Sequence, residues 1–255
     1  MFGVRDDGPV RWLTIENPSR RNAISFSAWP RLAELFGEFG SSEARVLVVI
    51  GEGEDFCSGA EVGSRMMAGP AFDAYATMAE VGAAAAALHR LSKPTIAAVD
   101  GVAVGAGMNL ALGCDLLIAT ERARFAEIFV KRGLTVDFGG TWLLPRRVGL
   151  ARAKELALTG RIFGAYEALA YGMATKVVPV DELVEAATEA ATELAAGAPL
   201  AQGFIKQGLD RSLEMSFDEA LSYEQQAQTV LFSSEDVIEG VASFVEKRNP
   251  EFRGR

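Results

Sequence analysis

The sequence predicts an α/β protein in which apolar strands alternate with helices and are followed by a region of helices alone. Three observations support this class. The runs at Arg45 to Ile50 and Thr95 to Val99 are continuously apolar after their first residue, which is typical of strands buried on both faces of a parallel sheet. Segments with helical spacing separate these runs, as right-handed crossovers between parallel strands require. From Val180 onward the strand signals give way to helical segments.

The expected elements follow one another along the chain. Val10 to Ile15 alternates like a strand and ends at a turn containing Pro18. Ser27 to Phe39 carries apolar residues at helical spacing, and Phe72 to Leu91 is predicted to be a long alanine-rich helix. The remaining predictions are strands at 45–50, 95–99 and 115–119 and helices at 107–112, 181–196, 199–213, 216–229 and 234–246.

Composition limits the possible functions. The 255 residues include 49% apolar and 23% charged residues, enough for a sizeable core. A net charge of −9 argues against nucleic acid as a partner, because phosphate binding needs a basic surface. One histidine and two cysteines without ligand spacing predict no metal site, so Cys57 and Cys114 are expected to be buried thiols. Without a signal peptide or a membrane-length apolar run, we expect a cytoplasmic protein with no membrane partner.

The segment from Lys93 to Asp115 is the most informative part of the chain. A buried strand leads into a turn with Gly101, Gly105 and Gly107, and an apolar helix follows at once. Glycines allow the backbone to approach a ligand closely, and the first turn of a helix has unpaired N–H groups. Such a turn is suited to an anionic oxygen. A dinucleotide site is disfavoured because Leu110 stands where the third glycine of that motif belongs.

Four separated motifs, which follow one another in the same order as in the family, make the chain resemble the crotonase family of enoyl-CoA hydratases and isomerases. They are NPSRRNAIS at 17–25, DFCSGAEV at 55–62, KPTIAAVDGVAVGAGMNLALGCD at 93–115 and FVEKRNPEF at 244–252. The resemblance implies a crotonase-like ββα spiral at 1–196 with a C-terminal helical trimerisation region at 197–255. It also implies an acyl-CoA thioester as substrate, coenzyme A as part of that substrate with no separate cofactor, and a homotrimer or dimer of trimers.

The same resemblance implies that the backbone amides of Ala60 and Ala106 form an oxyanion hole for the thioester carbonyl. Removing a proton beside a thioester, or adding a nucleophile to its conjugated alkene, places negative charge on that oxygen. Each fixed N–H donor in comparable sites contributes roughly 2.7–4 kcal/mol of stabilisation. A helix starting near Gly107 would add its positive end.

The acid–base positions indicate which reaction follows. Family hydratases carry two glutamates, and the matching positions here are Asn109 and Phe129. Neither side chain accepts a proton near neutral pH, which argues against hydration in the usual manner. Asp137, in GLTVDFGGTWLLPR, is similarly placed to the proton-transferring aspartate of family isomerases, above all the ring-epoxide isomerases of phenylacetyl-CoA catabolism. A partly desolvated aspartate suits this role, although Asp137 is also placed to cap a helix beginning at Phe138.

The other candidate residues have structural or substrate-binding roles. We interpret Glu127 and Lys131, four residues apart, as a surface helix pair. The candidates for lining an acyl pocket, each of which also suits an ordinary core, are Met66, Met67, Phe129, Phe138 and Trp142. Resemblance to the family assigns substrate binding to Arg21, Asn22, Ala23, Ser58, Glu61, Gly105, Asn109, Phe129, Trp142, Phe244 and Lys247.

We therefore predict an acyl-CoA isomerase that shifts a double bond, or rearranges an epoxide, with Asp137 as its acid–base group. Two alternatives remain open at this point. One is an enoyl-CoA hydratase that adds water through atypical acids. The other is a non-catalytic acyl-CoA-binding protein.

Overall fold

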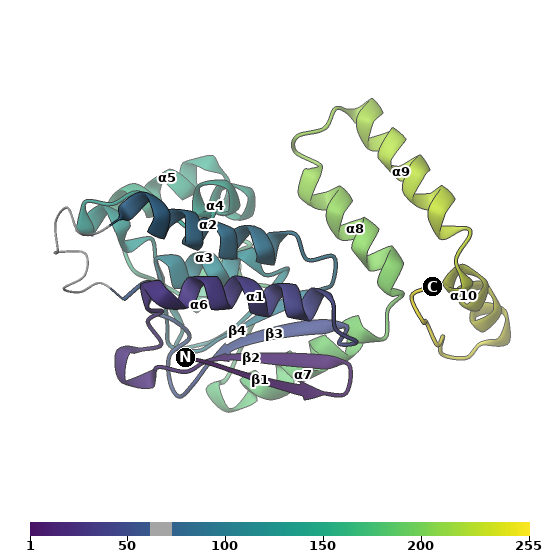
Figure 1. Cartoon of the computed structure of the whole chain (residues 1–255), viewed down its shortest axis with the longest axis horizontal. Coiled ribbons are helices and arrows are strands. Elements are labelled where there is room, and N and C mark those ends of the chain that lie inside the picture. Colours follow the sequence, from purple (N-terminus) through teal and green to yellow (C-terminus); the bar gives the residue numbers. More distant parts are fainter. Residues whose placement is uncertain (62–72) are drawn as a thin grey trace.

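The computed structural model describes residues 1–61 and 73–255, and it contains a six-stranded sheet with helices on both faces (Figure 1). The strand order is β1-β2-β3-β4-β6-β9, with β1 antiparallel to β2 and every other pair parallel. The strands are β1 (Phe2–Asp7), β2 (Val10–Ile15), β3 (Val46–Gly51), β4 (Thr95–Val99), β6 (Leu116–Thr120) and β9 (Lys176–Val178).

The central strands are apolar because both of their faces are covered. Leu47 and Val49 of β3 belong to a core shared with helices α1 (Trp29–Gly40) and α2 (Ala74–His89). Val46 and Val48 point to the opposite face, which is covered by α7 (Leu183–Ala195). Successive side chains alternate between the two faces, so an uninterrupted apolar run is what a doubly covered strand needs.

A second, smaller sheet lies beside the first. It consists of β5 (Val102–Val104), β7 (Arg124–Ala126) and β8 (Phe163–Gly164), in the order β5-β7-β8. Each of the first two strands directly follows a strand of the large sheet, and β5 leads into α3 (Ala106–Gly113). This strand–strand–helix order is that of the expected crotonase-like ββα spiral, which the structure confirms.

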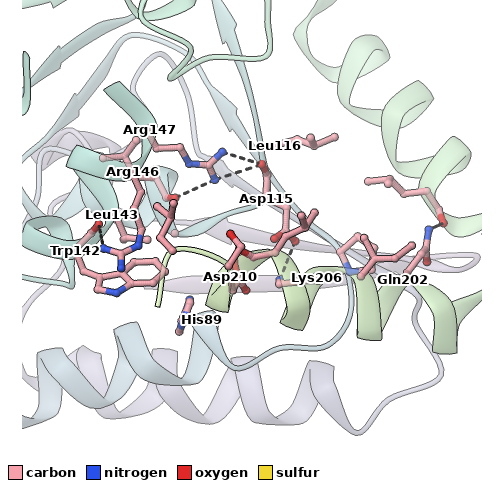
Figure 2. Close-up of a pocket in the computed structure, with 18 residues that line it drawn as sticks. His89, Asp115, Leu116, Trp142, Leu143, Arg146, Arg147, Gln202, Lys206 and Asp210 are labelled. Carbon is pink, nitrogen blue, oxygen red and sulfur yellow. Dashed lines mark hydrogen bonds and ion pairs between the residues drawn. The ribbon is translucent and has the colours of Figure 1, made fainter. Parts of the chain in front are cut away.

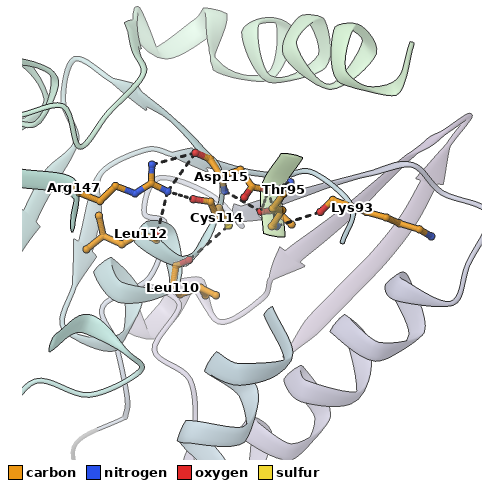
Figure 3. Close-up of polar contacts among 8 residues, drawn as sticks. Lys93, Thr95, Leu110, Leu112, Cys114, Asp115 and Arg147 are labelled. Carbon is orange, nitrogen blue, oxygen red and sulfur yellow. Dashed lines mark hydrogen bonds and ion pairs between the residues drawn. The ribbon is translucent and has the colours of Figure 1, made fainter. Parts of the chain in front are cut away.

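Helix α3 lies in the centre of the molecule, and its residues from Ala106 to Leu112 are all buried. Arg147 of α4 (Gly140–Val148) fixes its C-terminal end (Figure 3). The guanidinium donates to the backbone oxygens of Leu112, Cys114 and Asp115 over 3.3, 2.6 and 3.3 Å. These bonds satisfy carbonyls at the end of the helix and hold α4 against α3. Helices α5 (Leu150–Thr159) and α6 (Ala165–Ala170) follow.

The last three helices extend away from the sheet (Figure 1). They are α8 (Pro199–Arg211), α9 (Phe217–Leu231) and α10 (Glu235–Glu246), as the helical spacing predicted. Ser216 begins α9 with a capping box that includes Glu219, and Ser234 caps α10. In the described parts of the chain, no helix has the length and apolar character needed to cross a membrane.

Candidate active site

Three segments far apart in the sequence converge at the start of α3. The amide of Ile24 donates to the oxygen of Gly59 over 2.9 Å, and the amide of Glu61 donates back to the oxygen of Ile24 over 2.8 Å. The amide of Val104 donates to the oxygen of Cys57 over 3.0 Å. A side chain at position 107 would collide with the same Cys57 carbonyl, so Gly107 is required for this close approach.

This convergence brings Ala60 and Ala106 to one place. Ala106 is the first residue of α3, where an amide has no acceptor within the helix. The backbone of Gly59, next to Ala60, lies against that amide, since a Cβ on Gly59 would be 3.4 Å from the nitrogen of Ala106. Among the residues that the structure describes, neither Ala60 nor Ala106 uses its amide as a hydrogen-bond donor. Two free N–H groups at a helix N-terminus are suited to bind an anionic oxygen.

Asp137 lies in the loop before α4, and it does not cap a helix. Phe138 and Gly139 both have positive φ, at 48° and 76°, so α4 begins only at Gly140 and the predicted capping role of Asp137 is wrong. The backbone oxygen of Asp137 instead accepts from Asn109 Nδ2 over 3.0 Å and from the amide of Gly140 over 2.9 Å. Its carboxylate Oδ1 is buried without a hydrogen-bond partner in the described structure. Burial raises the pKa of Asp137 to about 6.

Glu127 is a second buried carboxyl group next to Asp137. The sequence pattern suggested a surface pair with Lys131, and this interpretation is wrong because Glu127 is 0% exposed while Lys131 faces solvent. Residues Ile128–Arg132 form the 3-10 helix η4, in which positions four apart do not share a face. Burial first, and then the charge of Asp137, raise the pKa of Glu127 to about 8, although a contact with Asn109 acts in the opposite direction.

The sequence around Glu127 carries one signal of burial. Glu127 is the only charged residue between Phe125 and Phe129, in the run Phe-Ala-Glu-Ile-Phe. A single acid within such an apolar run is more consistent with a buried carboxyl than with an exposed helix face.

Asn109 and Phe129 occupy the two positions where the resemblance placed hydratase glutamates. Asn109 is fully buried, and its Nδ2 lies 3.5 Å from Glu127 Oε2 as well as bonding the oxygen of Asp137. Phe129 is buried and lies beside Gly105, where a Cβ would be 3.5 Å from the Phe129 ring. Neither position supplies a carboxylate, and Asn109 instead joins the two segments that do.

Several candidate substrate-binding residues lie on the two loops that flank Ala60. Arg21 is exposed with a left-handed backbone, and its oxygen accepts from the amide of Ser58 over 2.9 Å. Asn22 is fully buried. Its Oδ1 accepts a hydrogen bond from the amide of Asn17, and its Nδ2 donates to the backbone oxygens of Glu52 and Asp55. The side chain of Asn22 therefore organises the loop rather than facing a ligand.

Ala23 and Glu61 are two further substrate-binding candidates near Ala60. Ala23 is buried, and its oxygen accepts from the side chain of Asn17 over 2.9 Å. Glu61 lies 3.8 Å from Arg20, in a loose and largely exposed ion pair. Exposed pairs of this kind contribute little to stability, so both side chains are available to a ligand.

Phe138 and Trp142 line a cavity of about 470 Å³ between α2 and the end of α8. The indole Nε1 of Trp142 donates to Glu214 over 3.0 Å, and Arg146 stacks on the ring at 3.8 Å. The other aromatic candidates differ in placement: Phe129 lies at Gly105, and Phe244 is 84% exposed on α10 with the exposed Lys247 just after it. Met66 and Met67 lie outside the described residues.

A larger groove of about 550 Å³ lies between α4 and α8 (Figure 2). Several of its charged groups are paired, since Lys206 contacts Asp115 over 2.8 Å and Arg147 binds the backbone at the end of α3. The lining of this groove includes neither Asp137 nor Glu127. The two carboxyl groups with unpaired buried oxygens, those of Glu127 and Asp137, therefore lie outside this groove.

The two cysteines are buried in the core. Cys57 and Cys114 are free and buried, and burial raises the pKa of each thiol to about 12. Neither is therefore a reactive thiolate near neutral pH. Within the described ranges, no three His, Cys, Asp or Glu side chains are grouped so as to hold a metal ion.

Comparisons with known proteins agree on one family. The sequence profile of the enoyl-CoA hydratase/isomerase family matches residues 6–255. The chain is 38% identical over 250 residues to 1,2-epoxyphenylacetyl-CoA isomerase of Escherichia coli (strain K12), covering 96% of this chain and 95% of that protein. It is 35% identical over 255 residues to short-chain-enoyl-CoA hydratase of Clostridium acetobutylicum, covering 99% and 97%.

Solved structures give the same result. The crystal structure of enoyl-CoA hydratase from Bacillus anthracis matches with a TM-score of 0.95 and 30% identity, over 100% of this chain and 99% of that one. That of enoyl-CoA hydratase from Mycobacterium smegmatis matches with a TM-score of 0.91 and 30% identity, over 98% of each chain.

Proposed function

The chain belongs to the enoyl-CoA hydratase/isomerase family, and from that premise we propose that it is an acyl-CoA isomerase in which Asp137 carries the proton. One observation supports this choice above the others. The side chain of Asp137 is half-buried, its Oδ1 is buried without a hydrogen-bond partner in the described structure, and its backbone oxygen is bonded to Asn109 of α3. A carboxylate whose pKa is raised to about 6 by burial is a suitable base near neutral pH.

In the proposed reaction, Asp137 removes a proton from the carbon next to the thioester of a β,γ-unsaturated acyl-CoA. The electrons of the broken C–H bond form the enolate, whose negative charge lies on the thioester oxygen. The amides of Ala60 and Ala106 stabilise that charge. The protonated Asp137 then gives its proton to the γ carbon, and the double bond moves to the α,β position. One carboxyl group therefore performs both proton transfers, and no other reactant is needed.

An epoxide rearrangement is a second reaction of the same class. The relative from Escherichia coli carries the name of an isomerase of an epoxidised phenylacetyl-CoA. Opening such an epoxide also changes the bonding of an acyl-CoA without adding or removing atoms. A ring-epoxide CoA thioester therefore belongs in the substrate panel beside the unsaturated esters.

Hydration is the competing function, because several relatives are named as hydratases of enoyl-CoA or 2,3-dehydroadipyl-CoA. Hydration needs one group to activate water and one to protonate carbon. Glu127 supplies a second carboxyl near Asp137, but its side chain is 0% exposed and offers no surface to water. This burial favours isomerisation.

Turnover of two substrates distinguishes these functions. With 3-hexenoyl-CoA, isomerisation produces a conjugated enoyl thioester, so ultraviolet absorbance rises. With crotonyl-CoA, hydration destroys the conjugation, so absorbance falls. We expect the first reaction to be faster by at least about 10²-fold, the range that a positioned acid–base group contributes. Faster crotonyl-CoA hydration would make the protein a hydratase, and thermal stabilisation by acyl-CoA without turnover of any ester would make it a binding protein.

A further inference from the structure

We propose that Glu127 is a positioning residue of the active site. Its carboxyl group stays protonated and so leaves Asp137 as the single ionised carboxyl group of the site. Ionisation of Glu127 stops turnover. This inference rests on the proposed function, because it concerns how the base is kept ready for proton transfer. Glu127 stands at neither of the two positions, 109 and 129, where the resemblance placed the hydratase glutamates.

The geometry around Glu127 supports the proposal. The side chain has no solvent exposure, and its Oε2 lies 3.5 Å from Nδ2 of Asn109. Its Oε1 has no hydrogen-bond partner in the described structure, and the same is true of Asp137 Oδ1. The Nδ2 group of Asn109 also bonds the backbone oxygen of Asp137 over 3.0 Å. One amide group therefore contacts both segments that carry the carboxyl groups.

Among the described residues, no nearby positive charge balances the carboxyl groups of Glu127 and Asp137. Asp137 is the titratable group that faces Glu127 from the loop before α4, and α3 contributes only the uncharged Asn109. On the segment of Glu127 itself, Lys131 and Arg132 are exposed. On the α5 side, Arg161 is paired with Glu155 and Glu167. Within the described residues, no Lys, Arg or His lies within ion-pair distance of Glu127 or Asp137.

Two neighbouring carboxyl groups without a cation cannot both ionise readily in an apolar site. One of them keeps a proton, and the more deeply buried Glu127 is that one, because desolvation opposes its charged form most strongly. The site then holds one negative charge, on Asp137. Proton abstraction transfers this charge to the thioester oxygen and leaves both carboxyl groups neutral. An ionised Glu127 would leave a second negative charge near the enolate and oppose its formation.

The first test does not involve turnover. Carboxyl ¹³C NMR of the ligand-free protein, labelled in Glu and Asp, follows each acid as the pH rises. We expect one glutamate to titrate near pH 8, in keeping with its raised pKa. That signal should be absent in Glu127→Gln and should move to lower pH in Asp137→Asn, which removes the neighbouring charge. If every glutamate titrates near its ordinary pKa of about 4.3, the proposal is overturned whatever the enzyme's reaction is.

The second test follows the pH dependence of kcat with the ester that the protein isomerises. In the wild type, kcat should fall by at least about tenfold as pH rises through 8, the point where Glu127 ionises. Glu127→Gln cannot ionise and should lose this alkaline fall, with the change in kcat rather than in KM. Glu185→Gln, on the exposed face of α7, is the matched control and should keep the fall. A purely structural Glu127 predicts lower stability with an unchanged pH profile, and that result would reject the proposal.

Discussion

The side-chain amide of Asn109 donates to the backbone oxygen of Asp137 over 3.0 Å. This bond joins α3, whose first residue is Ala106, to the loop that carries the proposed base. The proposed oxyanion donor and the proposed base are therefore held at a fixed separation by one buried side chain. Position 109 would carry a glutamate in a family hydratase. Here it carries an asparagine, which supplies no acid and instead donates the hydrogen bond to Asp137.

The base is tested by Asp137→Asn, which keeps the size of the side chain and removes its basicity. We expect isomerase kcat to fall by at least about 10²-fold. Thermal stability should change little, because the bonds of Asp137 to Asn109 and Gly140 use its backbone oxygen. The exposed Asp181→Asn is the control and should retain full activity. Near-normal turnover in a folded Asp137→Asn protein would remove Asp137 from the mechanism.

The oxyanion donor is tested by Ala106→Pro, which deletes one amide. Proline is tolerated at the first position of a helix, so α3 should still form. Ala165→Pro is a close match, because Ala165 also begins a helix after a glycine and is also 1% exposed. We expect Ala106→Pro to lower kcat by about 10²-fold or more, with acyl-CoA binding partly retained. Equal losses in the two variants would indicate that the proline itself, and not the missing donor, caused the effect.

The sequence was sufficient for most of the long elements of the fold, although α5 was not predicted. Buried strands such as β3 and β4 are continuous apolar runs, and α1 has a clear helical period. The strands β5, β7 and β8 were missed because two or three residues are too few to show a period of two. Strand β1 was missed because its outward residues, such as Arg5 and Asp6, are exposed on an edge strand.

The site was only partly predictable, for physical reasons that differ between residues. Motif resemblance located the glycine turn, and the structure brings Ala60 and Ala106 together there. The cap expected at Asp137 failed because two consecutive positive φ values delay α4; Gly139 permits such a φ, but nothing in the residue type of Phe138 signals one. Glu127 was misplaced because pairing at four residues presupposes an α-helix, whereas the chain forms a 3-10 helix there.

The burial of Glu127 also predicts how stability depends on pH. Its pKa is raised in the folded protein to about 8, so between about pH 4.5 and 8 the folded state binds a proton that the unfolded state lacks. The free energy of unfolding should therefore fall as pH rises through this window, by at most about 1.4 kcal/mol per pH unit from this group. Urea midpoints measured across the window should show a smaller fall in Glu127→Gln. Parallel curves for the two proteins would contradict a raised pKa.

Assembly is tested by light scattering. Helices α8–α10 expose large apolar side chains, among them Leu209, Phe217 and Phe232, each more than two-thirds exposed. Exposed apolar side chains that gather in one patch mark an interaction surface. We expect a mass of three times the 27.2 kDa of the chain, or a multiple of that trimer. A clean monomer at micromolar concentration would refute the trimerisation role of 197–255.

Asn109 and Phe129 stand where the resemblance places the two hydratase glutamates, so restoring these acids tests the proposed preference for isomerisation. The wild type should hydrate crotonyl-CoA poorly, and the double change Asn109→Glu with Phe129→Glu should raise hydration by restoring a base and a proton donor. Asn109→Glu alone should help less, because it removes the bond to Asp137 and adds a charge near Glu127. Phe129→Glu alone keeps that bond and should retain more isomerase activity than the other variants. The measurement is the loss of crotonyl-CoA absorbance set against the conversion of 3-hexenoyl-CoA. Robust hydration by the wild type would overturn the isomerase proposal, and Asp137 would then be the first residue to test as the group that activates water.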